Sequence, residues 1–402
     1  MTPSPLRILL PFSLGYFFSY CLRTINGAIA PRLAAELGLD AATLGLMTSA
    51  YFLAFASAQL PIGLAIDRFG PRRVNVTLLA IAVSGCLLFA LARDAGLLIV
   101  ARSLIGFGVS GCLMTAIKAN AQWFPLARLP ALSGWVSFAG LFGAVVSTLP
   151  VAWIVERGGI ETVFLLAAGV GLTAALVQWT LVPDHPTQQV GKSLRQDLAG
   201  MVEVFTARRF WSLAAVAAVA LGSHMAMQGL WVGQWLRQVR HLDETQAGAT
   251  LMMMMLGGLT GALLWGQLAS RLARRGIPTL WVYAGASALH LVTLGLMAAD
   301  AAVSTTALIV VYGLSGIVGN LTYAVITSRF PVELAGRANT SVNLLIFVVA
   351  FITQAGYGYA LAALTQQGLT IAQAYGVVLG GTGVVVAVLL LWALLDRSAR
   401  QP

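Results

Sequence analysis

The chain has 402 residues, of which 58% are hydrophobic and only 9% are charged. Soluble globular domains carry about 25% charged residues, so this composition excludes a chain that folds mainly in water. The formal net charge of +10 at neutral pH would suit a nucleic-acid-binding protein. The positive residues are nevertheless spread over many short loops, and we expect no nucleic-acid partner.

Apolar stretches follow one another from the first residues to the last. Each is about 20 residues long, enough to cross a hydrocarbon core of roughly 30 Å as a helix. Segments in lipid must satisfy their own backbone hydrogen bonds, and the alternation typical of a barrel is missing from the sequence. We therefore predict an all-α integral membrane protein with twelve transmembrane helices, at residues 7–30, 42–66, 74–92, 96–120, 130–154, 161–182, 210–234, 246–269, 278–298, 303–328, 338–362 and 371–395.

One polar loop, at residues 183–209, divides these spans into six and six. The predicted domains are a six-helix bundle at 1–182, a cytoplasmic linker at 183–209 and a second six-helix bundle at 210–402. Apolar residues recur in the linker at helical spacing, which predicts an amphipathic helix on the cytoplasmic membrane face, with a flexible linker as the alternative. These residues are Leu194, Leu198, Met201, Val202 and Phe205.

The two predicted bundles repeat one another. The segment Gly63–Arg73 follows the second span, and a similar segment, Gly266–Arg275, follows the eighth span at an offset of 203 residues. An offset near half the chain length predicts a duplicated six-helix unit. Parallel repeats of this kind place a solute site between the repeats, near the middle of the bilayer.

The loops differ in charge. Most of the 24 lysines and arginines fall in one set of alternate loops. The opposite set holds Arg32, Arg93, Arg157, Arg237 and Arg240. Because positively charged loops stay on the cytoplasmic side, we predict a multi-pass protein of the plasma (inner) membrane with both termini in the cytoplasm.

Two motifs carry a resemblance to a known family. Gly63–Arg73, with the order Gly-Leu-Ala-Ile-Asp-Arg-Phe-Gly-Pro-Arg-Arg, resembles the motif after the second helix of the major facilitator superfamily. Arg102, Gly106 and Gly108 resemble its fourth-helix motif. The resemblance implies the major facilitator fold of two pseudo-symmetric six-helix bundles. It also implies a gating role for Asp67, Arg68, Arg72 and Arg73, with a topology signal as the alternative for the arginines. For Arg102 it implies a role in helix packing or the conformational cycle, with solute binding as the alternative.

Within that superfamily, the first half is most similar to the anion:cation symporter group. Arg23–Asn26 resembles a signature of its first helix, and Lys118–Pro125 resembles the end of its fourth helix. Leu22 and either Val109 or Ser110 stand where that group carries carboxylates that serve proton coupling, which leaves the coupling open. The same resemblance implies that helices 1, 4, 7 and 10 line the cavity.

The charges inside the predicted spans are unbalanced. All 14 acidic residues map to loops or span ends, whereas Arg23 and Arg102 lie inside spans and Lys118 lies near the end of one. A charge left unpaired at mid-bilayer costs about 2.5–3.5 kcal/mol on insertion scales, so such a residue usually faces an aqueous path or a partner. The sequence assigns no carboxylate to these cations, and we therefore predict an anionic or carboxylate-bearing solute.

Arg23 is the main candidate for solute binding. It shares one face of the first helix with Tyr20 and Asn26. The planar fork of a guanidinium group matches a carboxylate or a phosphate. The alternative is a structural arginine that bonds backbone carbonyls at a helix break.

Further candidates lie in the second half. In the seventh helix, His224 shares a face with Gln228 and Trp231, and it either carries a proton or stays neutral in packing. His290 is expected to be structural, and polar residues of the tenth and eleventh helices either line the cavity or bond between helices. The predicted solute-binding residues are Arg23, Tyr20, Asn26, His224, Gln228, Trp231, Asn320, Tyr323 and Asn343.

The predicted function is a secondary active or facilitative transporter that moves a small organic anion by alternating access, as a symporter, exchanger or uniporter. The alternatives are a transporter of zwitterions such as short peptides or amino acids, an exporter of lipophilic drugs, and a nutrient sensor without transport activity. The sequence has no G-x-S-x-G, H-E-x-x-H or G-x-x-x-x-G-K-[ST] motif, so we expect no enzyme. Cys21, Cys86 and Cys112 lack C-x-x-C spacing, and we expect neither a metal nor a cofactor. The expected partners are the solute and the lipid bilayer, with the protein a monomer.

Overall fold

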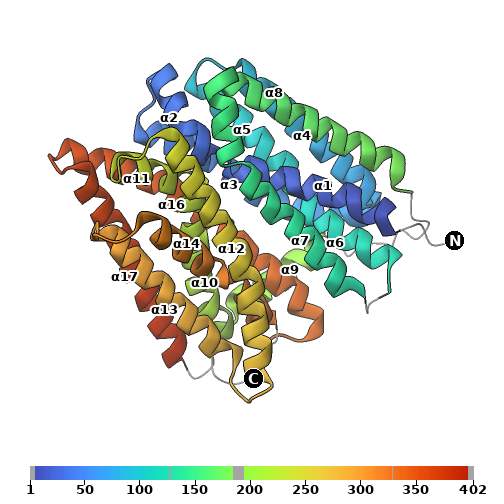
Figure 1. Ribbon diagram of the computed structural model, residues 1–402. Helices are drawn as coiled ribbons and strands as arrows, with labels where there is room; N and C mark the ends of the chain where they lie inside the picture. Colours follow the sequence, from blue (N-terminus) through green and yellow to red (C-terminus); the bar gives the residue numbers. More distant parts are fainter. Residues whose placement is uncertain (1–4, 126–127, 184–193, 328, 397–402) are drawn as a thin grey trace. The chain divides into compact units, whose positions relative to one another are not determined.

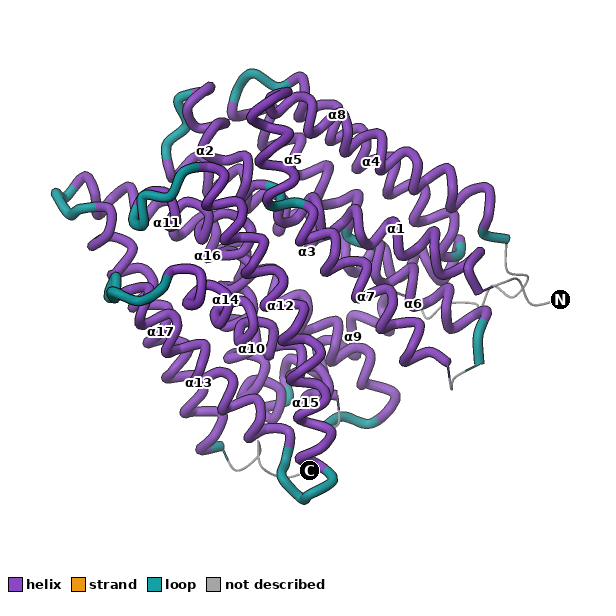
Figure 2. Tube along the Cα trace, viewed as in Figure 1, coloured by secondary structure: helices purple, strands orange, loops and turns teal. Residues whose placement is uncertain are grey.

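The computed structural model describes residues 5–125, 128–183, 194–327 and 329–396. In these residues helices are joined by short loops, and there is no strand (Figure 2). The chain divides into two compact units, Met1–Ser193 and Leu194–Pro402. Each unit has its own set of packed helices.

The first unit is built from helices that follow the predicted spans with several breaks. They are α1 (Pro5–Thr24), α2 (Asn26–Leu37), α3 (Ala41–Phe69), α4 (Pro71–Leu91), α5 (Ala95–Val109), α6 (Cys112–Trp123), α7 (Leu129–Val146) and α8 (Leu149–Leu181). Figure 1 shows α4 alongside α8, and the two helices are in extensive contact.

The first predicted span is a bent helix pair. α1 and α2 meet at an angle of 44°. The side chain of Asn26, the first residue of α2, donates to the Thr48 hydroxyl at 2.8 Å and so ties the bend to α3. The bend places the last turn of α1, which carries Arg23, next to an irregular piece of backbone.

The fifth and sixth predicted spans are divided differently from the prediction. The fifth comprises α7 and the first turns of α8, which follow a short break at Ser147 and Thr148. Gly159 then interrupts α8 with φ 76° and ψ 175°. A residue with a Cβ is strained at this φ, so glycine is the residue suited to the reversal. The rest of α8 corresponds to the sixth span.

Glycines let the helices of the first unit approach closely. A Cβ on Gly106 of α5 would overlap the backbone of Tyr51 in α3. A Cβ on Gly108 would overlap the backbone of α4 at Ala82. Small residues at helix interfaces are the usual means of close packing in lipid, where no hydrophobic effect drives helices together. The glycines of the fourth-helix motif therefore have a packing function.

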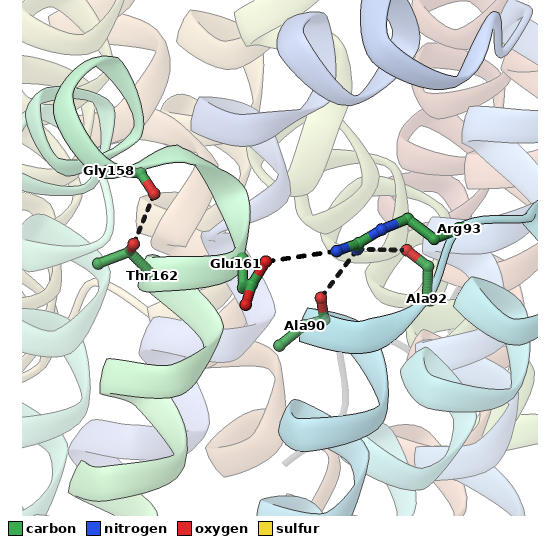
Figure 3. A network of polar contacts seen from close by, with 6 residues as sticks. All are labelled: Ala90, Ala92, Arg93, Gly158, Glu161 and Thr162. Carbon is green, nitrogen blue, oxygen red and sulfur yellow. Dashed lines mark hydrogen bonds and ion pairs between the residues drawn. The ribbon is translucent and has the colours of Figure 1, made fainter.

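An exposed polar network joins the end of α4 and the loop after it to α8, just past the break at Gly159 (Figure 3). Arg93 donates to the backbone carbonyls of Ala90 and Ala92 and forms an ion pair with Glu161 at 3.3 Å. The side chains of Arg93 and Glu161 are 68% and 52% exposed. An exposed pair of this kind contributes at most about 1 kcal/mol, so it orders the loop rather than holding the unit together.

The second unit begins with the linker helix and continues with the remaining spans. Its elements are α9 (Leu194–Thr206), α10 (Arg208–Ala226), the π-helical η2 (Met227–Trp231), α11 (Val232–Gln238), α12 (Glu244–Ala273), α13 (Thr279–Ala298), α14 (Thr305–Gly316), the 3₁₀-helical η3 (Ile317–Asn320), α15 (Leu321–Thr327), α16 (Val332–Gln366) and α17 (Ile371–Leu395). α13 lies alongside α17 (Figure 1).

The linker contains a helix, α9, which packs on α16 and α10. A Cβ on Gly200 would overlap the side chain of Arg337 in α16. Met201 and Val204 are buried, whereas Val202 is 61% exposed, so Val202 does not belong to the packed face. The side chains of Leu194 and Leu198 lie outside the described residues. The position of this helix on the cytoplasmic membrane face stays a prediction.

The helices fit the prediction of an all-α membrane protein. In the described part of the chain, ten helices are long and apolar enough to cross a membrane, and the bent α1–α2 pair makes an eleventh span. α7 has a shorter apolar stretch at Ala131–Val146 and, with the start of α8, covers the remaining predicted span.

Several acidic residues that the sequence places at span ends are helix caps. The carboxylates of Asp40, Asp94 and Asp243 accept backbone N–H groups at 2.7–2.9 Å, at the starts of α3, α5 and α12. A capping carboxylate satisfies an N–H group that has no partner within its helix. This role accounts for carboxylates at the ends of the spans rather than inside them.

Candidate functional site

The guanidinium group of Arg23 lies in an aromatic environment inside the first unit. Arg23 is 8% exposed and lies in the last turn of α1, just before the bend. Its Cζ is 4.4 Å from the centre of the Tyr20 ring and 5.5 Å from that of Phe55 in α3. Cations within about 6 Å of a ring centre are attracted to the face of the ring. α1 and α3 together therefore surround the positive charge with π faces.

Phenol groups add polarity to this environment. Tyr16, Tyr20 and Tyr51 all interact electrostatically with Arg23. Tyr16 and Tyr20 pack edge to face with ring centres 5.0 Å apart. A Cβ on Gly140 of α7 would lie only 2.6 Å from the Tyr16 ring, so this glycine makes room for the pair. The cluster of Arg23 and these tyrosines thus combines a planar cation with hydroxyl groups, which suits a carboxylate ligand.

Asn26, the third candidate of the first helix, is fully buried. Its Nδ2 donates to Thr48, whose hydroxyl in turn donates to the Leu44 carbonyl at 2.8 Å. Within the described residues its Oδ1 has no hydrogen-bond partner. Asn26 therefore has an observed role at the α2–α3 contact, and its predicted contact with a solute stays a prediction.

Arg102 lies in α5 and is completely buried. It donates from Nη1 to the Leu22 carbonyl at 3.0 Å, and its Cζ is 5.4 Å from the centre of the Tyr51 ring. The side chain thus joins α5 to α1 one residue before Arg23, and Tyr51 interacts with both guanidinium groups. This geometry supports a packing or conformational role for Arg102.

Lys118 forms an ion pair that the sequence interpretation missed. Its Nζ lies 2.7 Å from Oδ1 of Asp67, and the two side chains are 31% and 34% exposed. The expectation that Lys118 has no carboxylate partner was therefore wrong. α3 continues to Phe69, beyond the predicted end of the second span, and carries Asp67 to within reach of α6.

The arginines of the same motif have local contacts. Arg68 lies over the ring of Phe69 at 5.3 Å. Arg72 donates to the Trp179 carbonyl at 2.7 Å and lies 4.6 Å from the Trp179 ring centre, which fastens the start of α4 to α8. Arg73 is in the first turn of α4. The gating roles of Asp67 and these arginines stay predictions.

The seventh-helix candidates of the second unit occupy α10 and η2. His224 is 3% exposed and lies against rings from α13 and α14. Gln228 donates to the Met255 sulfur at 3.1 Å, and Trp231 donates from Nε1 to the Gln354 carbonyl at 3.2 Å. The face that the sequence assigns to one solute site is thus engaged in contacts to α12, α13, α14 and α16.

The tenth and eleventh helices contribute a bonded pair. The Tyr323 hydroxyl of α15 donates to Oδ1 of Asn343 in α16 at 2.9 Å, and both side chains are partly exposed. Asn320 ends η3, and its side chain lies outside the described residues. The structure thus brings Tyr323 and Asn343 together.

Several residues of these environments were missed by the sequence interpretation. Tyr51 and Phe55 lie beside Arg23, and His290 and Tyr312 lie beside His224. All four come from helices remote in sequence, so no spacing pattern links them to their partners. Among the described residues no group of three or more His, Cys, Asp or Glu could hold a metal ion.

Known proteins resemble this chain over most of its length. The model of the Major Facilitator Superfamily matches residues 12–354. The probable sulfoacetate transporter SauU of Cupriavidus necator is 27% identical over 280 residues, which cover 65% of this chain and 64% of that protein. The probable galactarate/D-glucarate transporter GudP of Escherichia coli is 24% identical over 290 residues, covering 64% of each chain. The chain thus spans less than two thirds of the length of either relative.

A solved structure shows the same fold. A bacterial homologue of the human lysosomal transporter Spinster, crystallised in an inward-facing and unoccupied conformation, has a TM-score of 0.80 and is 17% identical over 99% of this chain and 98% of that one. The fold agrees with the two motifs found in the sequence, and the family model covers most of the chain. The protein is a multi-pass membrane protein that belongs to the Major Facilitator Superfamily.

Proposed function

We propose that the protein transports small organic anions across the membrane by alternating access and does not change them chemically. The observation that carries the proposal is the buried guanidinium group of Arg23 among tyrosine rings, beside the bend of α1. A planar cation of this kind, inside a membrane-spanning segment, is suited to bind a carboxylate or sulfonate through paired hydrogen bonds.

The named solutes of the relatives support the anionic class. Sulfoacetate carries a sulfonate and a carboxylate group, and galactarate and glucarate each carry two carboxylates. These solutes differ in length and in hydroxyl groups but share planar or tripodal oxyanions. The guanidinium group of Arg23 matches that shared feature.

Binding at Arg23 would exchange one set of contacts for another. The π faces of Tyr20 and Phe55 attract the cation, whereas a bound oxyanion accepts charge-assisted hydrogen bonds from the guanidinium and from tyrosine hydroxyls. Such bonds are stronger at a site from which water is excluded. A solute drives alternating access only if it binds the two conformations with different affinity, and we propose that the bend beside Arg23 supplies this difference.

The substitution Arg23→Gln tests the proposal. It removes the charge and keeps a side chain of similar reach, so we expect the uptake of radiolabelled sulfoacetate or glucarate into proteoliposomes to fall to background. Arg23→Lys keeps the charge but loses the fork, and we expect a low residual uptake. Arg157→Gln, at an exposed arginine, is the matched control and should transport like the wild type.

All three variants must retain the thermal unfolding temperature of the wild type for the comparison to hold. Uptake by Arg23→Gln at the rate of the wild type would remove Arg23 from the binding site. Wild-type protein that moves lipophilic cations or peptides but none of the anions would reject the anion class.

We also propose that the protein resides in the plasma (inner) membrane as a monomer with both termini in the cytoplasm. The excess of Lys and Arg in one set of loops supports the cytoplasmic position of the termini. Accessibility of a C-terminal tag to protease in inside-out vesicles, and its protection in intact cells, tests the orientation.

A further inference from the structure

Three titratable rings meet inside the second unit. His224 comes from α10, His290 from α13 and Tyr312 from α14. The ring centres are 5.5 Å apart for the two histidines, and Tyr312 lies 5.0 Å from His224 and 4.8 Å from His290. His224 and His290 are 3% and 4% exposed, and Tyr312 is fully buried. We call these three residues the imidazole cluster.

The imidazole cluster has unused hydrogen-bonding capacity. His290 Nδ1 is 3.2 Å from the Ser315 hydroxyl. His224 Nδ1, His290 Nε2 and the Tyr312 hydroxyl have no partner among the described residues. Buried polar atoms are nearly always satisfied in native proteins, so unsatisfied ones call for an explanation. A neutral imidazole keeps one nitrogen lone pair, which can accept a proton without any bond being broken.

The helices around the imidazole cluster carry no charged residue near the cluster. Their charged residues lie near the helix ends. α13 (Thr279–Ala298), α14 (Thr305–Gly316) and α17 (Ile371–Leu395) contain no charged residue. The charged residues of α10 and α16 are confined to the first two turns of these helices, and those of α12, which packs on α14, to its first and last turns. They are Arg208, Arg209, Glu333, Arg337, Glu244 and Arg271. Tyr357 of α16 is the titratable group that faces Tyr312 from outside the cluster.

An imidazolium in this cluster would thus be held by ring faces rather than by a carboxylate. Both histidines lie within the distance at which a cation is attracted to the face of the Tyr312 ring. Because a buried charge without a counter-charge is unfavourable, the closed arrangement favours two neutral imidazoles. Uptake of a proton therefore favours a conformation in which the cluster is open to water.

Two irregular helix segments adjoin the imidazole cluster. α10 passes into the π-helical η2 at Met227, one turn after His224. α14 passes into the 3₁₀-helical η3 directly after Gly316, and a Cβ on Gly316 would overlap the His224 ring. π and 3₁₀ segments inside longer helices often mark functional or hinge positions. Protonation of His224 would therefore place a charge beside the irregular segments of α10 and α14, where these two helices can change their backbone geometry.

We propose that His224 and His290 form a proton-binding site that couples anion transport to the proton gradient. The inference rests on the proposed anion transport. One proton from the acidic side adds to a free imidazole nitrogen and leaves on the other side, so that its positive charge accompanies the anion. This site differs from a first-unit carboxylate, because Leu22 and Val109 or Ser110 stand where the resembling group carries its carboxylates.

The test separates coupling from transport. Proteoliposomes are loaded with glucarate or sulfoacetate, and exchange of the anion is measured without a pH gradient. Accumulation is then measured with the outside made acidic. The two anions are divalent, so one proton per anion still moves a net negative charge, and the membrane potential is held at zero with valinomycin and equal K+ on both sides. Under this clamp the wild type should accumulate the anion up to about tenfold per pH unit. His290→Gln should retain exchange and lose the accumulation.

The control is His241→Asn, at an exposed histidine with φ 55° in the loop after α11, a backbone conformation that asparagine tolerates. It should behave like the wild type in both assays. Two results would overturn the proton site and leave anion transport standing. One is exchange without any accumulation in the wild type, and the other is accumulation by His290→Gln equal to that of the wild type. The absence of exchange in the wild type would instead overturn the proposed function.

A measurement on the wild type covers the case in which His290→Gln does not fold. The ring ¹⁵N chemical shifts of His224 and His290 are followed from about pH 3 to 8, with and without the anion, because a buried imidazole stays neutral to lower pH than an exposed one. We expect the anion to move the titration of at least one of the two. Shifts that stay constant under all of these conditions would overturn the proposal.

Discussion

At the residue scale, side chains could be predicted where their own helix determines what they do. Arg23 stands out in the sequence as a cation inside a span, and the structure places it beside Tyr20, its predicted neighbour. Partners from other helices could not be predicted, because no spacing relates Tyr51 to Arg23 or His290 to His224. Lys118 shows the same limit, since its pairing with Asp67 depends on where α3 ends.

The pair Lys118–Asp67 gives a prediction at this scale. A double-mutant cycle with Lys118→Met and Asp67→Asn should give a coupling energy of about 0.5–1 kcal/mol, because the two side chains are about one third exposed. Thermal unfolding in detergent measures the free energies. The same cycle on Arg93 and Glu161, which are more exposed, should give less coupling. Additive single effects at Lys118 and Asp67 would contradict the ion pair.

At the element scale, the spans could be predicted from apolar length, whereas their irregular segments could not. A helix in lipid shows in the sequence as a run of apolar residues, whatever its exact backbone geometry. The bend of α1 and α2 and the π turn of η2 both lie at contacts with neighbouring helices, which the sequence does not reveal. Gly159 is a single glycine among 42, and its φ of 76° in α8 has no separate sequence signal.

Gln354 shows how a neighbouring helix supports such a segment. It is fully buried in α16. With its amide oriented to suit both neighbours, it donates to the Ala226 carbonyl at 2.9 Å and accepts from Trp231 Nε1 at 3.0 Å. Ala226 directly precedes the π turn of η2, and Trp231 is its last residue. Gln354 therefore holds the turn in place.

We expect Gln354→Leu to destabilise the protein by about 1–3 kcal/mol, because both hydrogen bonds of the amide are lost and the Trp231 indole N–H keeps only the Gln354 backbone carbonyl as acceptor. Thermal unfolding measures the loss. The exposed Gln367→Leu, near the end of the same helix, should change the stability little. Equal stability of both variants would show that the turn does not depend on this amide.

At the scale of the whole molecule, composition was the strongest guide. With 9% charged residues, the chain needs lipid as its main solvent, and lipid restricts the fold to helices or a closed barrel. The two motifs then identified the superfamily, and the repeat offset of 203 residues indicated two similar halves. The solute could not be predicted in the same way, because it depends on a few side chains contributed by several helices.

Equilibrium binding of the anion to purified protein tests the central claim, that Arg23 holds the solute, most directly. Titration calorimetry in detergent compares wild type, Arg23→Gln and the exposed control Arg157→Gln with sulfoacetate or glucarate. A charge-assisted hydrogen bond contributes about 1.5–3 kcal/mol, so Arg23→Gln should weaken binding by roughly 10- to 100-fold while the control is unaffected. Unchanged affinity of folded Arg23→Gln would contradict the claim.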